Sequence, residues 1–307
     1  MEEQSKCLQV GNDDAEVLSL GSKTENCLTE RLIDNDDDSN DENPQRQPDK
    51  KVFKDVEDCI QRAGGVSRFQ YFSFTLIVFG MVCGAFILYC ISYFTKVPPL
   101  LCQATEGAEW KDCKPKVACD DKKTYKYKPD PDAIDTLTNW VSQIDLYCTE
   151  DFEMSLIGSM FFIGTFLGSF ILPRAADVYG RKPLFLIGLA LYIGVAIALI
   201  FVENLYTLYV LMFLGGISET GRYYVAYVYI VEMMPAKVQD AFGIYIFFVF
   251  AFAMTWIALQ FWFITKDVFV NNYIALAMAG FSWITVIFFV PESPRFLFST
   301  KQYEKAR

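Results

Sequence analysis

Six long apolar runs constrain the fold of this chain more than any other feature of its sequence. Each has roughly the 20 residues that a helix needs to cross the hydrocarbon core of a bilayer. They cover Ser73–Phe94, Met154–Leu172, Leu184–Val202, Leu205–Val231, Phe242–Ile264 and Tyr273–Val290. Because lipid offers no hydrogen-bond partner to a bare amide or carbonyl, each run must be helical. The sequence therefore predicts an all-α membrane protein with six spanning helices.

Charge is divided unevenly between the tail and the body of the chain. Residues 1–55 hold 15 acidic and 7 basic residues, whereas the rest holds 22 acidic and 20 basic ones. Such an acidic segment buries too little apolar surface to offset its ordering entropy. We therefore expect residues 1–51 to form a disordered cytoplasmic tail. Residues 52–72, with apolar side chains at helical spacing, are expected to form a helix at the cytoplasmic membrane surface.

The composition also excludes several classes of function. The body of the chain lacks the excess of basic residues that nucleic-acid binding requires. There is no histidine for imidazole chemistry. The glycine loop of nucleotide-driven pumps and the serine elbow of hydrolases are both missing. We therefore expect neither an enzyme nor a bound cofactor or metal.

Lysines and arginines in the short connections predict how the chain is oriented. They gather before span one, between spans two and three, and after span six. By the positive-inside rule, both ends of the chain are cytoplasmic. Residues 95–153 then form an extracellular loop, most naturally at the plasma membrane. Its four cysteines predict two disulfides whose pairing the sequence leaves open, among Cys102, Cys113, Cys119 and Cys148.

Span four carries two charged residues near its midpoint, Glu219 and Arg222. A charge inside a bilayer is costly, so such residues are functional candidates by default. Their three-residue spacing places both on one helix face. They can pair with each other as a purely structural contact, or they can bind an ionic substrate, since even a mutual pair can line a wet cavity. The sequence alone supports both interpretations.

Two motifs resemble those of the major facilitator superfamily. Residues 177–182 match its Asp-x-x-Gly-Arg-Arg/Lys pattern in the tight connection between spans two and three. Residues 291–297 match the Pro-Glu-Ser-Pro-Arg segment of the sugar- and organic-ion-transporting branches. The resemblance implies a gating role for these charged and turn residues and for the acid that closes span four: Asp177, Gly180, Arg181, Lys182, Glu232, Glu292 and Arg295.

Two further motifs resemble those of the organic cation, organic anion and carnitine transporter family. Residues 64–70 are similar to its segment before span one, and residues 145–148 to its Asp-Leu-Val-Cys before span two. A large cysteine-bearing loop between these spans is another mark of the family. The resemblance covers about residues 52–307. It implies a transporter of small organic ions that works by alternating access.

The resemblance also suggests where a substrate binds. Aligned with the family's span four, Tyr223 and Tyr227 fall on its substrate-contacting aromatic positions, although both can also be ordinary packing residues. Aromatic rings suit an amine through cation–π attraction and a flat anion through stacking. Trp256 and Gln260 in span five are weaker candidates. The sign of the cargo stays open, because Arg222 favours anions, Glu219 favours cations, and a zwitterion such as carnitine suits both.

The chain also departs from the family. Members have twelve spans in two halves, so we interpret residues 154–290 as spans two to six of an N-terminal half and residues 291–307 as the start of the cytoplasmic linker. The missing C-terminal half, or a homodimer partner, would complete the carrier. A sugar-type transporter and a non-transporting scaffold or receptor on the same fold are the alternatives. The scaffold or receptor alternative is supported by the missing second half and by Val178, Met212 and Gln239, where the family pattern has charge partners. Gln143, Ile144 and Pro173 are further departures from that pattern.

Overall fold

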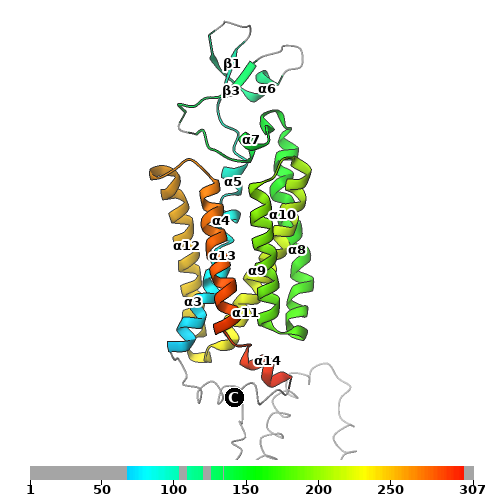
Figure 1. Cartoon of the computed structure of the whole chain (residues 1–307), viewed down its shortest axis with the longest axis vertical. Helices are drawn as coiled ribbons and strands as arrows, with labels where there is room; N and C mark the ends of the chain where they lie inside the picture. The colour runs from blue at the N-terminus through cyan, green and yellow to red at the C-terminus, as the bar shows by residue number, and fades with distance from the viewer. Residues whose placement is uncertain (1–67, 104–108, 120–125, 134, 301–307) are drawn as a thin grey trace, which may run out of the picture. The chain divides into compact units, whose positions relative to one another are not determined.

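The computed structural model describes residues 68–103, 109–119, 126–133 and 135–300. The predicted tail, most of the predicted surface helix and the last linker residues lie outside these ranges. The described chain is a bundle of long helices that carries a small folded cap at one end (Figure 1). The short helix α14 (Pro294–Ser299) lies at the opposite end.

All six apolar runs are helical. Within the described residues, five stretches are long and apolar enough to cross a membrane: Arg68–Phe94, α8 (Asp151–Tyr179), α9 (Arg181–Ile200), α12 (Gln239–Phe263) and α13 (Phe269–Phe289). The remaining run forms three consecutive segments of 15, 5 and 9 residues, which are α10 (Leu205–Glu219), the π-helical η2 (Thr220–Tyr224) and α11 (Val225–Met233). Span four is thus widened by a π-turn that contains Arg222, a feature found frequently at functional sites.

Span one is interrupted, although its sequence reads as one apolar run. It consists of α3 (Arg68–Val82), α4 (Ala85–Leu88) and α5 (Ile91–Phe94). Residues 83–84 and 89–90 form turns between these pieces. Residues 68–72, which the sequence assigns to the surface helix, are the first residues of α3. The break at residues 83–84 lies beside the charged pair of span four, as described below.

Glycines allow α8 and α10 to pack backbone against backbone. A Cβ on Gly216 of α10 would overlap the carbonyl of Phe161 and lie 2.7 Å from the amide nitrogen of Thr165, both in α8. Gly164 of α8 meets the backbone of Phe213 in the same way. Small residues at such crossings let membrane helices approach closely. This contact therefore fixes the position of span four, which carries most of the candidate site.

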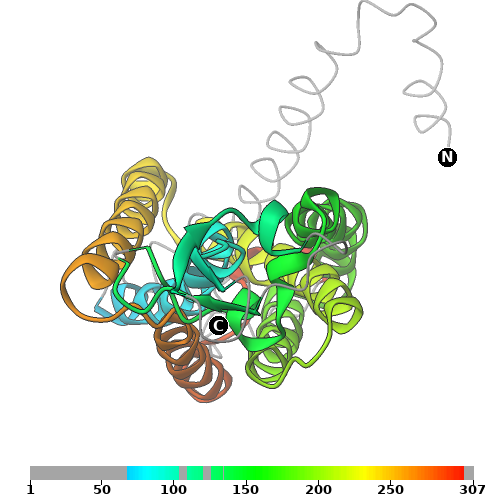
Figure 2. The ribbon, with the colours of Figure 1, turned by 90° about the horizontal axis from the view of Figure 1, so that it is seen from above.

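Helices α8 and α12 leave most of their apolar surface outside the bundle. In the most apolar 18-residue stretch of each helix, only 22% (α8) and 28% (α12) is buried, compared with 72% in span one. Seen from above, the two helices lie on opposite sides of the bundle (Figure 2). Large side chains line their exposed faces: Phe162, Phe166 and Phe170 on α8, and Phe247, Phe248 and Phe252 on α12. These faces meet either lipid or another apolar surface.

The cap contains a sheet that the sequence did not predict. Strands β1 (Leu100–Gln103), β2 (Lys111–Cys113) and β3 (Lys126–Pro129) pair antiparallel in the order β2-β1-β3. The structure also assigns the two disulfides. Cys102–Cys113 joins β1 to β2, and Cys119–Cys148 joins the end of α6 (Pro115–Ala118) to η1 (Leu146–Cys148).

Asp145, the first residue of the motif that precedes span two, forms a sharp turn of the backbone. With φ at 55°, it is the one non-glycine residue in the described ranges with a positive φ, a conformation that aspartate tolerates better than most residues. It leads the chain into η1 and hence into the second disulfide. Burial, together with the Asp145 carboxylate, raises the pKa of Tyr127 and of Tyr147. Both hydroxyls therefore remain protonated at neutral pH.

A short segment, Thr138–Gln143, attaches the cap to the bundle; we call it the strap. Thr138 exchanges backbone hydrogen bonds with Lys266 and Val268, between α12 and α13. Asn139 is fully buried, and its amide donates to the carbonyls of Tyr93 (2.9 Å) and Lys96 (2.8 Å), at the end of span one.

Gln143 completes the strap. Its amide donates to the carbonyls of Ile200 (2.9 Å) and Val202 (3.0 Å), at the end of α9. The glutamate that the family pattern places at this position has no donor for these carbonyls. This departure therefore suits the structure.

The Asn139→Asp variant tests the strap. The side chain of Asn139 also accepts a hydrogen bond from Ser142 N at the start of α7 (Trp140–Gln143). Aspartate keeps that cap but turns a buried carboxylate toward two carbonyl oxygens, so we expect a loss of about 2–3 kcal/mol and easier proteolysis of the cap. Asn204→Asp is the matched control, because exposed Asn204 also caps a helix. Equal stability of the two variants would contradict the assigned role.

Candidate functional site

The two charged residues of span four form an ion pair inside the bundle. Arg222 Nη2 donates to Glu219 Oε2. Arg222 is fully buried and Glu219 is 8% exposed. The pairing satisfies a charge that would otherwise be uncompensated away from water. The structure thus shows the mutual pair, and a role of these residues toward a substrate stays a prediction.

Arg222 also reaches across to the broken part of span one. Its Nη1 donates to the carbonyls of Gly80 (3.2 Å) and Met81, at the end of α3. The ring of Tyr192 in α9 lies 4.7 Å from the guanidinium carbon, and its hydroxyl donates to the carbonyl of Cys83 at 2.9 Å. Side chains of spans three and four thus satisfy carbonyls at the break, as a membrane interior requires.

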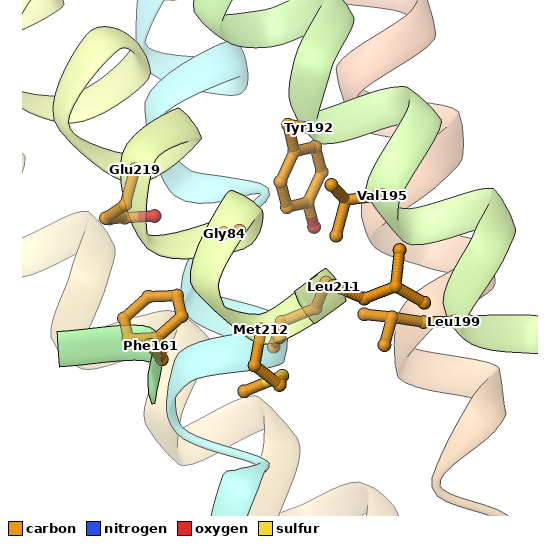
Figure 3. A pocket seen from close by; sticks show the side chains of 10 residues that line it. Gly84, Phe161, Tyr192, Val195, Leu199, Leu211, Met212 and Glu219 are labelled. Atoms are coloured by element: carbon orange, nitrogen blue, oxygen red, sulfur yellow. The ribbon is translucent and has the colours of Figure 1, made fainter. Parts of the chain in front are cut away.

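A small cavity adjoins the pair. Glu219, Gly84 and Tyr192 line it together with apolar side chains such as Phe161 and Met212 (Figure 3). Its volume of about 10 Å³ suffices for roughly one water molecule. A typical small-molecule site encloses about 300–1,000 Å³. The charged pair therefore lies in the packed interior of the bundle, beside a space too small for an organic ion.

Two tyrosines of span four, Tyr223 and Tyr227, contact α12. The ring of Tyr223 packs edge-on against Phe250 of α12 at 5.2 Å and against Tyr224 at 5.3 Å. The hydroxyl of Tyr227 lies over Gly243 of α12, 3.4 Å from where a Cβ would stand. Tyr223 is half-buried and Tyr227 is 37% exposed. We call Tyr223, Tyr227 and Phe250 the aromatic wall. The sequence pattern does not point to Phe250.

A second cavity opens beside Tyr227. It encloses about 310 Å³ between α8 and span four, which lies within the range of small-molecule sites. Its lining combines aromatic, apolar and charged residues: Pro173, Ala176, Asp177, Arg181, Tyr224, Val225, Tyr227 and Val228. This cavity therefore connects one side of the aromatic wall with the motif between spans two and three.

Trp256 and Gln260 lie in different surroundings despite their four-residue spacing. Gln260 belongs to the buried stripe of α12 and is 2% exposed. Within the described chain, neither its amide oxygen nor its nitrogen has a hydrogen-bond partner. Trp256 is 39% exposed. Neither residue lines either of the two cavities above.

The predicted gating residues gather at the end of the bundle opposite the cap. The guanidinium of Arg181 donates two hydrogen bonds to the carboxylate of Glu232, both at 3.0 Å, and pairs with Asp177 at 2.7 Å. Ser293 Oγ donates to the same glutamate at 2.5 Å. Asp177 is 67% exposed at its side chain, so its pairing contributes little compared with that of buried Glu232.

Glu292 caps the start of α9 from across the bundle. Its Oε1 accepts hydrogen bonds at 3.0 Å from the backbone amides of Arg181 and Lys182, where the helix dipole favours a negative charge. Gly180, with φ at 105°, allows the turn, and a Cβ there would lie 2.6 Å from Glu292 Oε2. Arg295 is exposed at the surface.

Several residues of these clusters were missed by the sequence analysis. Tyr192 and Gly84 shape the surroundings of Arg222, and Ser293 joins the gating cluster. The hydroxyl of Tyr229 donates to the carbonyl of Pro291 and so connects span four to the segment after span six. For Tyr192 and Tyr229, the signal in the sequence was a polar hydroxyl within an apolar run. Such a hydroxyl indicates that a hydrogen bond forms inside the membrane, but it does not identify the partner.

Comparison with known proteins identifies the family. The sugar (and other) transporter family matches residues 103–307, more than half of the chain. This chain belongs to that family of the major facilitator superfamily. Human organic cation/carnitine transporter 2 is 32% identical over 173 residues, which are 55% of this chain and 30% of the human protein. Mouse solute carrier family 22 member 21 is 31% identical over the same length, again 55% and 30%.

A more distant relative shows the same pattern. The organic cation transporter-like protein of Drosophila melanogaster is 26% identical over 161 residues, covering 52% of this chain and 28% of the fly protein. The chain thus matches less than a third of the length of each of these relatives. It resembles organic cation and carnitine transporters over about half of its own length.

Residues that depart from the family pattern pack without disturbing the fold. Gln239, at an expected arginine position, donates to the carbonyls of Val231 (2.9 Å) and Met234 (3.0 Å) and so caps the end of α11. Met212 stands at a second position where the family pattern has an arginine. It is 1% exposed and lines the small cavity. Val178 is exposed on α8. The structure therefore accommodates Gln239 by local hydrogen bonding, Met212 by apolar packing and Val178 by exposure at the surface.

Proposed function

We propose that the chain is the N-terminal half of a transporter that moves small organic cations, or the cationic end of a zwitterion, across a membrane by alternating access. The single observation that carries the choice of charge is the burial of Arg222. Its guanidinium is engaged by Glu219 and by two backbone carbonyls and is not exposed. It is therefore not free to bind an anionic cargo directly.

The residues that remain for contact with a cargo are aromatic. Tyr227 and, in part, Tyr223 expose their rings, while buried Phe250 of α12 packs edge-on against Tyr223 from behind. Ring faces attract ammonium groups by about 0.5–2 kcal/mol. Glu219 and Arg222 then act on the cargo electrostatically from behind this wall. Exposed Trp256 and buried Gln260 of α12 are proposed as further contacts. The names of the relatives, organic cation and carnitine transporters, agree with this choice.

We further propose that the exposed faces of α8 and α12 pack against a second six-helix unit, which is either a C-terminal half or another copy of this chain. Each face carries a row of exposed phenylalanines. The two helices lie on opposite sides of the bundle (Figure 2). The relatives are far longer than the matched segment. The two disulfides support placing the cap outside the cell, since disulfides persist in oxidising compartments.

Uptake of tetraethylammonium tests this function. Cells that express the complete protein should take it up saturably, with little uptake of benzoate at the same concentration. Loss of one cation–π contact of about 1–2 kcal/mol in Tyr223→Ala or Tyr227→Ala should lower uptake roughly 5- to 30-fold, whereas Tyr223→Phe should retain it. Tyr206→Ala is the control, because Tyr206 of α10 is 78% exposed. Saturable uptake of benzoate but not of tetraethylammonium would refute the assignment of charge.

A further inference from the structure

Three oxygen atoms converge on the guanidinium of Arg222 at the first break in span one. Two are the carbonyls of Gly80 and Met81, at the C-terminal end of α3. The third is Oε2 of Glu219, at the end of α10. The C-terminal end of a helix carries partial negative charge, and the carboxylate adds a full one. The protein thus assembles a small, buried, negative site made only of oxygen ligands.

Such a set of ligands is chemically suited to an inorganic monovalent cation. In transporters with discontinuous helices, unwound carbonyls and half-helix C-terminal ends coordinate Na⁺ near the middle of the membrane. In this chain the position is already filled by a cation that belongs to the protein. A guanidinium is a permanent cation in proteins. The site is therefore occupied whatever the ionic conditions.

The surroundings leave no room for a second cation. Gly84 lies so close to the guanidinium that a Cβ at this position would overlap it. The ring of Tyr192 covers it at 4.7 Å. The adjacent cavity, at about 10 Å³, accepts roughly one water molecule. Besides Glu219, the titratable groups that the structure places around Arg222 are the buried Cys83 and Tyr192, both neutral when protonated.

We propose that Arg222 is a tethered cation that permanently occupies a Na⁺- or K⁺-type site formed by Gly80, Met81 and Glu219. The protein therefore needs no inorganic cation at this position. Removal of the guanidinium exposes the oxygen ligands and creates a site for a free monovalent cation. The occupancy is a property of the folded chain, whereas its consequence, uptake that does not depend on Na⁺, rests on the proposed function.

Thermal unfolding of the purified complete protein tests the occupancy without reference to transport. The unfolding temperature is measured in NaCl, KCl and MgCl₂ at equal ionic strength, because Mg²⁺ gives up its hydration shell reluctantly and does not suit this site. The wild-type protein should give the same value in all three. Arg222→Ala should unfold at a lower temperature in MgCl₂ and recover part of the loss, saturably, in NaCl or KCl. Arg222→Ala combined with Glu219→Gln is the matched control and should lose this ion dependence.

The outcomes separate this inference from the proposed function. A wild-type protein that is stabilised by Na⁺ or K⁺ relative to Mg²⁺ would overturn the occupancy, and this arm does not depend on any variant. A folded Arg222→Ala protein indifferent to the three salts would also overturn it; Arg222→Gln, which fills more of the space, is the second variant should alanine prevent folding. Tetraethylammonium uptake that requires Na⁺ contradicts the inference but supports transport. Absence of uptake in every salt refutes transport and leaves the unfolding result to decide occupancy.

Discussion

Replacing Gly216 by alanine is expected to disrupt the contact between α8 and α10. The added Cβ would overlap a backbone carbonyl of α8, which cannot rotate away as a side chain can. Helices α8 and α10 must then separate, and their packing is lost along much of their length. Overpacking of a core costs typically about 1–3 kcal/mol, and a clash with backbone falls at or above the top of this range.

The measurement is the unfolding temperature in detergent, with folded yield as a second readout. Gly194→Ala in α9 and Gly280→Ala in α13 are matched controls, because a Cβ at either position would meet nothing within 4 Å. Both controls should equal or slightly exceed the stability of the wild-type protein, since alanine favours helices over glycine by about 1 kcal/mol. A Gly216→Ala protein as stable as these controls would show that α8 and α10 do not pack as described.

Replacing Glu219 by glutamine is expected to cost about 3–5 kcal/mol. The change preserves the shape of the side chain but removes the negative charge that compensates Arg222, which is fully buried. Breaking a buried pair in this way leaves an uncompensated charge, which costs far more than the pair itself contributes. Arg222→Gln should destabilise the protein for the converse reason.

The double variant distinguishes pairing from independent roles. Glu219→Gln with Arg222→Gln leaves no uncompensated charge, so it should be more stable than the sum of the two single effects predicts, by about 0.5–3 kcal/mol. Asp177→Asn is the matched control: it also breaks a carboxylate–arginine pair, but the Asp177 side chain is 67% exposed and its loss should cost at most about 1 kcal/mol. If Glu219→Gln were tolerated as well as Asp177→Asn, the buried pair would not be a structural element.

The apolar runs of the sequence predict the spans but not their interruptions. Residues 83–84 of span one lie within an unbroken apolar run, so hydropathy does not reveal the break between α3 and α4. The break depends on Arg222 and Tyr192, which are more than 100 positions away along the chain and bond its carbonyls. Such a contact between distant side chains is not encoded in local periodicity.

The candidate site shows the same limit. Helical spacing predicts that Glu219 and Arg222 share a face, but it does not say whether that face meets water or protein. Trp256 and Gln260 have an equally suggestive spacing, yet one is 39% and the other 2% exposed. The disulfide pairing depends on the register of β1 and β2, which places Cys102 near Cys113. Cysteine positions alone cannot distinguish this pairing from the two others.

The strap has a mechanical consequence for the carrier that we propose. Because Thr138–Gln143 bonds to the ends of span one and α9 and to the connection between α12 and α13, these helix ends cannot spread apart independently. If the bundle rotates in the proposed transport cycle, the cap must rotate with it as one rigid body. A pair of fluorophores on β3 and on the cap end of α9 should then keep a constant separation, while the distance from a fluorophore on β3 to one on the proposed second unit should change with each rotation.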